Sequence, residues 1–145
     1  MLACSVTNRV VNEFNTGFKT SKHFKRKYKR TTRSKHRQQL TPDLLNRNFC
    51  MPKKDHAWVA DITYIYTREG WLYLVTVLDL HSRKVAGWSM SDRLKKELVL
   101  KAFRQAVDQR RPHAGLILHS DRGSQYASDE FRKLLSVRAY RQSMS

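Results

Sequence analysis

Two runs of ten residues, rich in β-branched and aromatic side chains, constrain the fold of this chain most. WVADITYIYT spans residues 58–67 and WLYLVTVLDL spans residues 71–80. A short connection with Gly70 separates them, which is typical of two antiparallel strands joined by a tight turn. A third run, RKVAGWSM, follows at residues 83–90 after another polar break. We therefore expect a three-stranded antiparallel meander, in which Gly87 marks a β-bulge or the close approach of another element.

Beyond the meander, the apolar period changes from that of a strand to that of a helix. Ser91 and Asp92 offer a candidate N-cap. The apolar positions then recur every three or four residues, at Leu94, Leu98, Val99, Ala102, Phe103 and Ala106. Arg110 and Arg111 suit the negative end of a helix, and Pro112 ends it. This segment predicts an amphipathic helix.

The last third of the chain predicts a strand, a helix and a strand. GLILHSD, residues 115–121, is short and apolar, so we expect a fourth strand reached through a helical crossover. Ser128 suits the N-cap of a second helix, with Asp129 and Glu130 in its first turn. Residues 137–144 are expected to form a fifth strand. The predicted order, β-β-β-α-β-α-β, is that of an α/β fold.

Basic residues concentrate in the first third of the chain. Residues 1–54 contain 14 Lys and Arg against 2 Asp and Glu, whereas residues 55–145 contain 15 against 10. Residues 19–37 hold ten basic residues and no acidic one, so we expect an extended or disordered arm unless a polyanion orders it. The expected parts are a basic arm and linker at 1–54 and one folded domain at 55–145. The charge favours nucleic acid as partner over an anionic membrane or a merely solvated surface.

Other classes of protein are disfavoured by composition. Cys4 and Cys50 lie far apart without a second pair, which argues against a disulfide framework and a zinc site. No apolar run approaches the ~18 residues that a spanning helix needs, and the first residues lack the charged start of a signal peptide. We therefore expect a cytoplasmic protein without a membrane partner.

Two aspartates occupy positions that the strand pattern does not explain. Asp61 lies in the middle of the first apolar run, where a carboxylate is costly unless it is paired or binds a cation. Asp121 ends the fourth strand and, taken alone, has the features of a turn or cap residue. The predicted order can place these two strands side by side. The pair then predicts two oxygen ligands for a hard divalent cation such as Mg²⁺.

The segments WVADITYI, GWLYLVTVLDLHSRKVAGWSM and LHSDRGSQYAS, in this order, resemble the catalytic core of the DDE transposases of bacterial insertion-sequence family three, relatives of retroviral integrases. The resemblance runs from about residue 46 to residue 145. It implies an RNase H-like fold with three antiparallel and two parallel strands. It also implies that Asp61 and Asp121 are the first two catalytic aspartates. They would hold Mg²⁺ or Mn²⁺ for DNA phosphodiester cleavage and strand transfer, the chemistry of DNA transposition and integration.

The resemblance further implies a third ligand, a glutamate on a helix beyond the fifth strand, which the sequence to Ser145 does not reach. Glu130 lies only nine residues past Asp121 and is not expected to replace it. We therefore expect a core that is incomplete at its C-terminal end, as in a truncated copy, that holds metal weakly if at all and is inactive alone. The alternative is a non-catalytic DNA-binding remnant that acts through its basic arm.

The expected partners are DNA, as transposon ends and target, a second copy of the chain, and a helix-turn-helix protein from an upstream reading frame. The expected location is the bacterial cytoplasm, in association with the nucleoid. The residues expected to contact DNA lie in the arm and in the loop after the fourth strand: Lys25, Arg26, Lys27, Lys29, Arg30, Arg33, Lys35 and Arg122.

Overall fold

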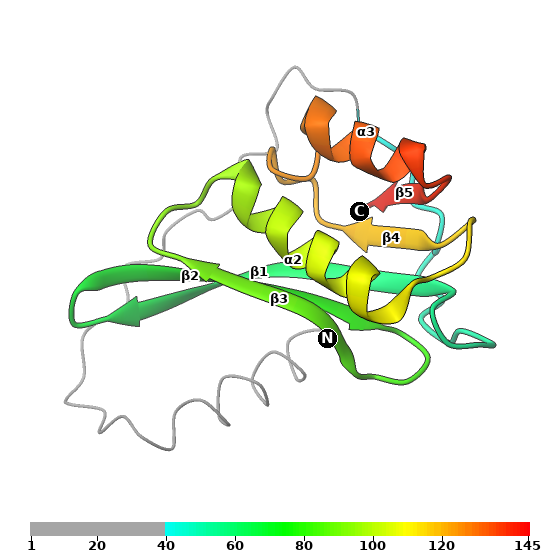
Figure 1. The fold of residues 1–145 in the computed structure, drawn as a ribbon, viewed down its shortest axis with the longest axis horizontal. Helices are drawn as coiled ribbons and strands as arrows, with labels where there is room; N and C mark the ends of the chain where they lie inside the picture. The colour runs from blue at the N-terminus through cyan, green and yellow to red at the C-terminus, as the bar shows by residue number, and fades with distance from the viewer. Residues whose placement is uncertain (1–39) are drawn as a thin grey trace. The chain divides into compact units, whose positions relative to one another are not determined.

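The structure is a computed structural model, and it describes residues 40–145 (Figure 1). Its elements follow the predicted order. They are β1 (Ala57–Thr67), β2 (Gly70–Asp79), β3 (Val85–Ser91), α2 (Lys96–Arg110), β4 (Ile117–Ser120), α3 (Asp129–Val137) and β5 (Arg141–Met144). The sequence pattern therefore identifies the type of every helix and strand in the described part of the chain.

The five strands form one mixed sheet in the order β3-β2-β1-β4-β5. The meander β1-β2-β3 is antiparallel, and β4 and β5 join it in parallel at the β1 edge. This arrangement confirms the predicted three antiparallel and two parallel strands. It places β1 in the centre of the sheet, with β2 on one side and β4 on the other (Figure 1).

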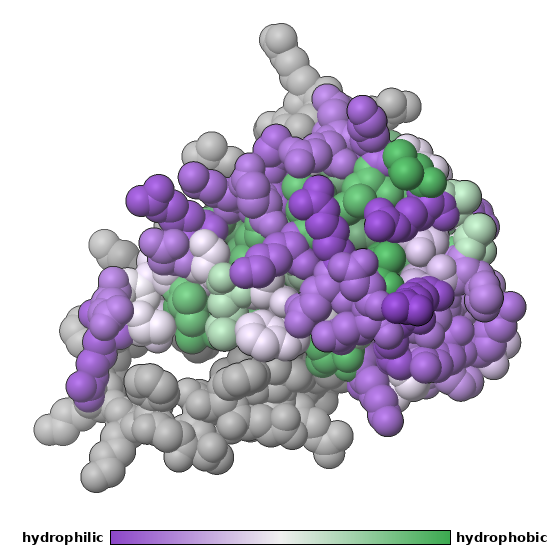
Figure 2. Space-filling model, in the orientation of Figure 1, coloured by the Kyte–Doolittle hydropathy of each residue, from purple (hydrophilic) through white to green (hydrophobic). Residues whose placement is uncertain are grey.

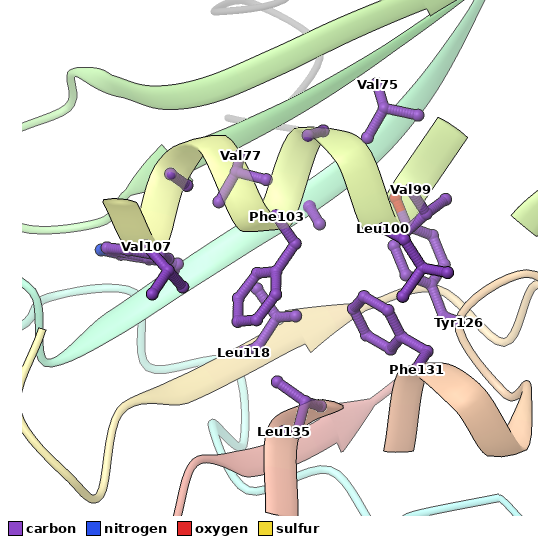
Figure 3. Close-up of a cluster of buried hydrophobic side chains, with 14 of the residues drawn as sticks. Val75, Val77, Val99, Leu100, Phe103, Val107, Leu118, Tyr126, Phe131 and Leu135 are labelled. Carbon is purple, nitrogen blue, oxygen red and sulfur yellow. The ribbon is translucent and has the colours of Figure 1, made fainter. Parts of the chain in front are cut away.

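Helices α2 and α3 cover one face of the sheet (Figure 1). Phe103 of α2 is at the centre of this core, with ring-centroid distances of 6.2 Å to Trp58 of β1 and 5.6 Å to Phe131 of α3. Figure 3 shows Phe103 and Phe131 between the two helices, above Leu118 of β4. The outward surface of the helices is mostly hydrophilic, as Figure 2 shows for this side of the described residues. The amphipathic pattern of the sequence therefore predicts which side of α2 and α3 is buried.

The opposite face of the sheet is partly covered by residues 44–51, which precede β1. Leu45 is buried there against Ala57, Leu80 and Ile117. The Leu44 backbone N–H donates a hydrogen bond of 2.8 Å to Ser143 Oγ of β5. The linker pattern of this segment in the sequence gave no sign of this packing, because its few apolar residues follow no regular period.

The predicted N-cap of α2 at Ser91 and Asp92 is wrong. Ser91 is the last residue of β3, and its hydroxyl accepts a hydrogen bond of 3.1 Å from the Arg93 N–H. The helix begins later, with Lys95 at the N-cap position and no side chain capping it. Two turn-forming residues next to a strand stabilise the turn after the strand, and the sequence alone does not separate this role from capping.

Candidate active site

Asp61 and Asp121 are brought together by the parallel pairing of β1 with β4. The register pairs Ala57 with Ile117 and Val59 with His119. If this register is continued by two residues, Asp61 lies opposite Asp121. Asp121 directly follows Ser120, the last residue of β4. Asp61 itself lies in the middle of β1 and pairs with Thr76 of β2 on its other side. The two carboxylates thus lie at one point of the sheet, beside the end of β4.

The ionised form of Asp61 is disfavoured at this position. Burial raises its pKa, the Ile62 N–H partly opposes this by hydrogen bonding, and the negative charge of Asp121 raises the pKa further. Asp121 is exposed, so it remains hydrated while Asp61 does not. A half-buried carboxylate next to a like charge is costly without a cation. A positive charge beside the two carboxylates would reduce this cost.

Replacing Asp61 by Asn is expected to stabilise the metal-free protein by about 1 kcal/mol near neutral pH. A carboxyl whose pKa is raised in the folded state is most favourable to folding when protonated, and its contribution falls as pH rises above its unfolded pKa. The gain from Asp61→Asn should therefore shrink as pH is lowered towards about 4. Urea unfolding in EDTA at several pH values measures this difference in the free energy of unfolding between Asp61→Asn and the original chain. A loss of stability at neutral pH would contradict the burial and repulsion described here.

The loop after β4 holds the Asp121 carboxylate in close contact with its own backbone. Asp121 Oδ1 accepts a hydrogen bond of 3.0 Å from the Gly123 N–H. A Cβ atom at Gly123 would lie 2.9 Å from Asp121 Oδ1 and 3.2 Å from Gln125 Oε1. A side chain at position 123 would therefore displace oxygen atoms at the site. Glycine therefore allows the Asp121 carboxylate and the Gln125 side chain to pack closely against the backbone at position 123.

Tyr126, in the loop after β4, is a buried residue that the sequence pattern did not indicate. It follows Asp121 by five residues, is fully buried, and packs its ring against Phe131 at a centroid distance of 5.8 Å. Its hydroxyl has no hydrogen-bond partner among the described residues. The signal in the sequence was the tyrosine itself. A large aromatic residue is unusual in a polar, exposed loop such as GSQYAS, so its presence there indicates burial.

The donor atoms fit a hard divalent cation. Both side chains are carboxylates, which Mg²⁺ and Mn²⁺ prefer. Within residues 40–145, no group of three His, Cys, Asp or Glu side chains is placed to hold a metal. Glu130 is in the first turn of α3, where it pairs with Lys96 Nζ at 2.7 Å. In this structure the Glu130 carboxylate therefore takes part in an exposed ion pair with α2.

The predicted DNA contacts divide between the loop and the arm. Arg122 is exposed and adjoins Asp121 in the loop after β4. The arm residues of this prediction lie outside the described residues: Lys25, Arg26, Lys27, Lys29, Arg30, Arg33 and Lys35. In the part of the chain that is described, no helix is long and apolar enough to cross a membrane.

The fold and its carboxylate pair define a class of protein, and comparison of the sequence identifies that class. The family described as the integrase core domain matches residues 51–145. The chain therefore belongs to the integrase core domain family.

Curated relatives carry the same region. A 31 kDa protein of insertion element IS600 from Shigella sonnei is 43% identical over 121 residues, covering 83% of this chain and 44% of the relative. The IS904 transposase of Lactococcus lactis is 43% identical over 72% of this chain and 41% of its own length. Transposase InsF of insertion sequence IS3A from Escherichia coli is 39% identical over 120 residues, covering 83% of this chain and 42% of the relative. These relatives confirm the predicted resemblance to insertion-sequence family three. The chain spans less than half the length of each.

Solved structures confirm the predicted RNase H-like fold. A chain of the simian T-cell lymphotropic virus intasome, in complex with a PP2A regulatory subunit, aligns with a TM-score of 0.58 and 20% identity, over 74% of this chain and 37% of that one. The HTLV-2 integrase catalytic core domain in complex with magnesium aligns with a TM-score of 0.54 and 22% identity. The alignment covers 62% of this chain and 60% of the integrase chain.

Proposed function

We propose that this chain supplies the catalytic core for DNA transposition, with Asp61 and Asp121 as ligands of Mg²⁺ or Mn²⁺. The observation that carries the proposal is the parallel register of β1 and β4, which brings together two carboxylates that are 60 residues apart in sequence. Membership of the integrase core domain family and relatives that are transposases support it. The magnesium bound to the HTLV-2 integrase core supports the choice of cation.

The residues of the site have separate tasks in this proposal. A bound divalent cation would supply activation of a water or a 3′-hydroxyl and stabilisation of charge on the DNA phosphate. Asp61 is fixed by the central strand, and Asp121 is oriented by the Gly123 N–H. Gly123 lets the Asp121 carboxylate pack against the loop backbone, and the exposed guanidinium of Arg122 contacts a DNA phosphate.

We propose that residues 40–145 alone hold the cation weakly and do not sustain cleavage. Two carboxylates leave most of the coordination sphere of Mg²⁺ to water. A two-metal site, with metals about 3.5–4 Å apart, needs further ligands. A polypeptide that adds a third carboxylate to Asp61 and Asp121 is then expected to be the active form.

Cleavage is tested with the chain extended by the segment that follows the matched region in the Shigella sonnei relative. Nicking of DNA that carries insertion-sequence ends should appear with Mn²⁺ in the extended protein. Asp61→Asn and Asp121→Asn should each reduce it about 100-fold or more, because each removes a ligand. Asp129→Asn, in the exposed first turn of α3, is the matched control. Cleavage that survives both ligand substitutions would overturn the proposed roles.

A second candidate function, DNA binding without catalysis, is favoured by the ten basic residues at 19–37. Affinity for duplex DNA should fall roughly 1,000-fold between about 50 and 200 mM salt, because cationic side chains release counterions from phosphates. Asp61→Asn and Asp121→Asn should leave this binding unchanged. Replacing the seven predicted arm contacts by Gln should flatten the salt dependence. Fluorescence anisotropy measures these changes, and a salt-independent affinity would exclude this function.

The remaining partners are also part of the proposal. We propose that the chain acts on transposon ends and target DNA in the bacterial cytoplasm, at the nucleoid. A second copy of the chain and a helix-turn-helix protein from an upstream reading frame would complete the assembly. Analytical ultracentrifugation with and without end-sequence DNA tests the oligomer, which should form or grow on DNA.

A further inference from the structure

The end of the β1–β2 hairpin carries a cluster of four aromatic rings. Tyr64 and Tyr66 of β1 lie opposite Tyr73 and Trp71 of β2 in the antiparallel register. The ring centroids are 5.0 Å apart for Tyr64 and Tyr73 and 5.2 Å apart for Tyr66 and Trp71, and both pairs meet edge to face. Tyr64 also contacts Trp71 in this way, at 6.5 Å. These contacts hold the four rings in place at the end of the hairpin.

The cluster becomes more exposed towards the hairpin turn. Strand alternation places its rings on the same face of the sheet as Val75, which lies in the main core. Tyr73 still packs against this core, but Trp71 is 40% exposed and Tyr66 is 70% exposed. Helix α2 does not cover them, because β3 ends at Ser91 opposite Tyr73 and the helix then runs back along β3. Two aromatic side chains are thus presented to solvent beyond the start of α2.

The hairpin end and the carboxylate pair lie at the same end of the sheet. β4 pairs with β1 only at residues 57–59 and ends at Ser120, whereas β1 continues to Thr67. Figure 1 shows the hairpin extending beyond the end of β4. Tyr66 follows Asp61 by five residues, which corresponds to ~16 Å of strand at ~3.3 Å per residue. The carboxylates and the rings face opposite sides of the sheet, and a DNA strand that passes the end of β4 can reach both.

The loop after β4 lies within electrostatic reach of the cluster. Burial raises the pKa of Tyr64 most, and Tyr73 and the negative charge of Asp121 raise it further. This effect agrees with the register of β1 and β4, which places Asp121 beside Asp61, three residues before Tyr64 along β1.

The chemistry of the exposed rings favours nucleobases over a protein partner. At about 250 Å² for a whole aromatic side chain, Tyr66 and Trp71 together expose roughly 300 Å². A stable interface between proteins needs about 800 Å² from each partner. Bases stack on such rings whatever their sequence, and the formal net charge of +17 attracts DNA to the chain. The adjoining turn carries charges of both signs, Arg68 and Glu69, so the rings rather than a local charge define the surface.

We propose that Tyr66 and Trp71 form a stacking surface for unpaired bases of the DNA strand that leaves the Asp61–Asp121 site. The inference rests on the proposed function of the two aspartates, because that function places the strand at the end of β4. The ~16 Å separation limits the stacked bases to roughly the first five nucleotides beyond the reacting phosphate, at ~3.4 Å per nucleotide. Stacking holds the strand without reading its sequence, and neither ring takes part in the chemical step.

The first measurement is the affinity of the full chain for DNA in EDTA, by fluorescence anisotropy. A duplex with an unpaired 3′ extension of five thymidines should bind at least about 10-fold more tightly than one whose extension has five abasic sites, which keep the phosphates but lack bases. Tyr66→Ala and Trp71→Ala should each lower this ratio about 5-fold or more, because each removes a stacking face. Tyr66→Phe keeps the ring and should keep the ratio.

Trp88→Ala is the matched control for Trp71→Ala. Trp88 is 41% exposed, and its pairing with Thr76 places it on the face of the sheet opposite the aromatic cluster. Its substitution should leave the ratio unchanged. A loss equal to that of Trp71→Ala would overturn the assignment of the stacking surface to the hairpin end.

The second measurement locates the contact by photochemical cross-linking. Iodouracil placed at successive positions of the extension should cross-link to Tyr66 or Trp71 on irradiation, and mass spectrometry identifies the modified peptide. Cross-links confined to the basic residues 19–37 would overturn the proposal, because the arm alone would then hold the extension.

The outcomes separate this inference from the function on which it rests. If DNA cleavage by the extended protein depends on Asp61 and Asp121 while Tyr66→Ala and Trp71→Ala keep the affinity ratio, only the stacking surface is overturned. If cleavage survives both aspartate substitutions, the proposed function fails, and the placement of the strand fails with it. Altered sedimentation of the DNA-free chain on Tyr66→Ala would also overturn the inference, because the rings would then contact a second copy of the chain.

Discussion

Gly87→Ala is expected to lower the free energy of unfolding by about 3 kcal/mol, the upper range for overpacking a core. Gly87 lies on β3 where α2 crosses it. A Cβ atom there would lie 2.5 Å from Ala102 O, 2.6 Å from Ala106 N and 2.8 Å from Ala106 Cβ. Two of these three atoms belong to the helix backbone, so α2 would have to move away from the sheet. Urea unfolding followed by circular dichroism measures the loss.

Gly70→Ala is the matched control for this substitution. Gly70 has φ +125 and no atom within 4 Å of its Cβ position, so its replacement strains only the local backbone, by about 1 kcal/mol. Adding Ala106→Gly to Gly87→Ala should restore little stability, because the backbone contacts remain. Equal losses for Gly87→Ala and Gly70→Ala would contradict the close packing of α2 on β3.

Asp79→Asn is expected to lower the free energy of unfolding by about 3 kcal/mol at neutral pH. Removing one partner of a buried, hydrogen-bonded charge pair typically has an effect of this size. Asp79 is fully buried at the end of β2. Its carboxylate accepts hydrogen bonds from the Ser82 N–H and Oγ and from the Asp55 N–H, and Arg110 Nη2 lies 4.0 Å away. An amide provides one acceptor where two are used, and it turns an NH₂ group towards a donor.

The stabilisation by Asp79 should also depend on pH. Burial opposes ionisation of Asp79, but hydrogen bonds from Ser82 and Asp55 and the charge of Arg110 outweigh it and lower its pKa. A carboxyl with a lowered pKa stabilises above its unfolded pKa, and this contribution is lost as pH falls through the folded value. The difference between the original chain and Asp79→Asn should therefore begin to shrink below about pH 4, near the unfolded pKa, and be lost as the pH falls through the lower folded pKa.

Asp92→Asn is the control for Asp79→Asn. Asp92 is exposed, and its 3.9 Å contact with the exposed Arg93 is of a kind that contributes little. Its substitution should leave the unfolding curve nearly unchanged at every pH. A similar response of Asp79→Asn would show that the buried network does not stabilise the fold.

The sequence pattern predicts the sheet, the helices and the carboxylate pair because each leaves a local signal. Runs rich in β-branched and aromatic residues identify β1 and β2, and an aspartate inside the first of these runs makes Asp61 conspicuous. The two alternatives for Gly87, a β-bulge and a close approach, both hold. The register of β2 and β3 shifts between Val77 and Leu78, opposite Gly87, and α2 packs directly on this glycine.

Features that depend on contacts between distant segments left no such signal. The sequence indicates Asp79 as a turn residue, and it does accept hydrogen bonds from Ser82 in the following turn. Asp79 is buried beside Arg110 and Asp55 because the end of α2 meets the segment just before β1. No local sequence pattern indicates this meeting. The same holds for the burial of Tyr126, which needs α3 and β5 to pack against the loop after β4.

The most direct test of the proposed metal site is the position of Mn²⁺ on the protein, measured by paramagnetic broadening of amide NMR signals. Broadening should begin at residues 60–62 and 120–124, in the two segments that the parallel register of β1 and β4 brings together. Asp61→Asn and Asp121→Asn should each remove it. Broadening centred elsewhere, for example on Asp55 and Asp79, or broadening unchanged by both substitutions, would contradict the assignment of these aspartates as metal ligands.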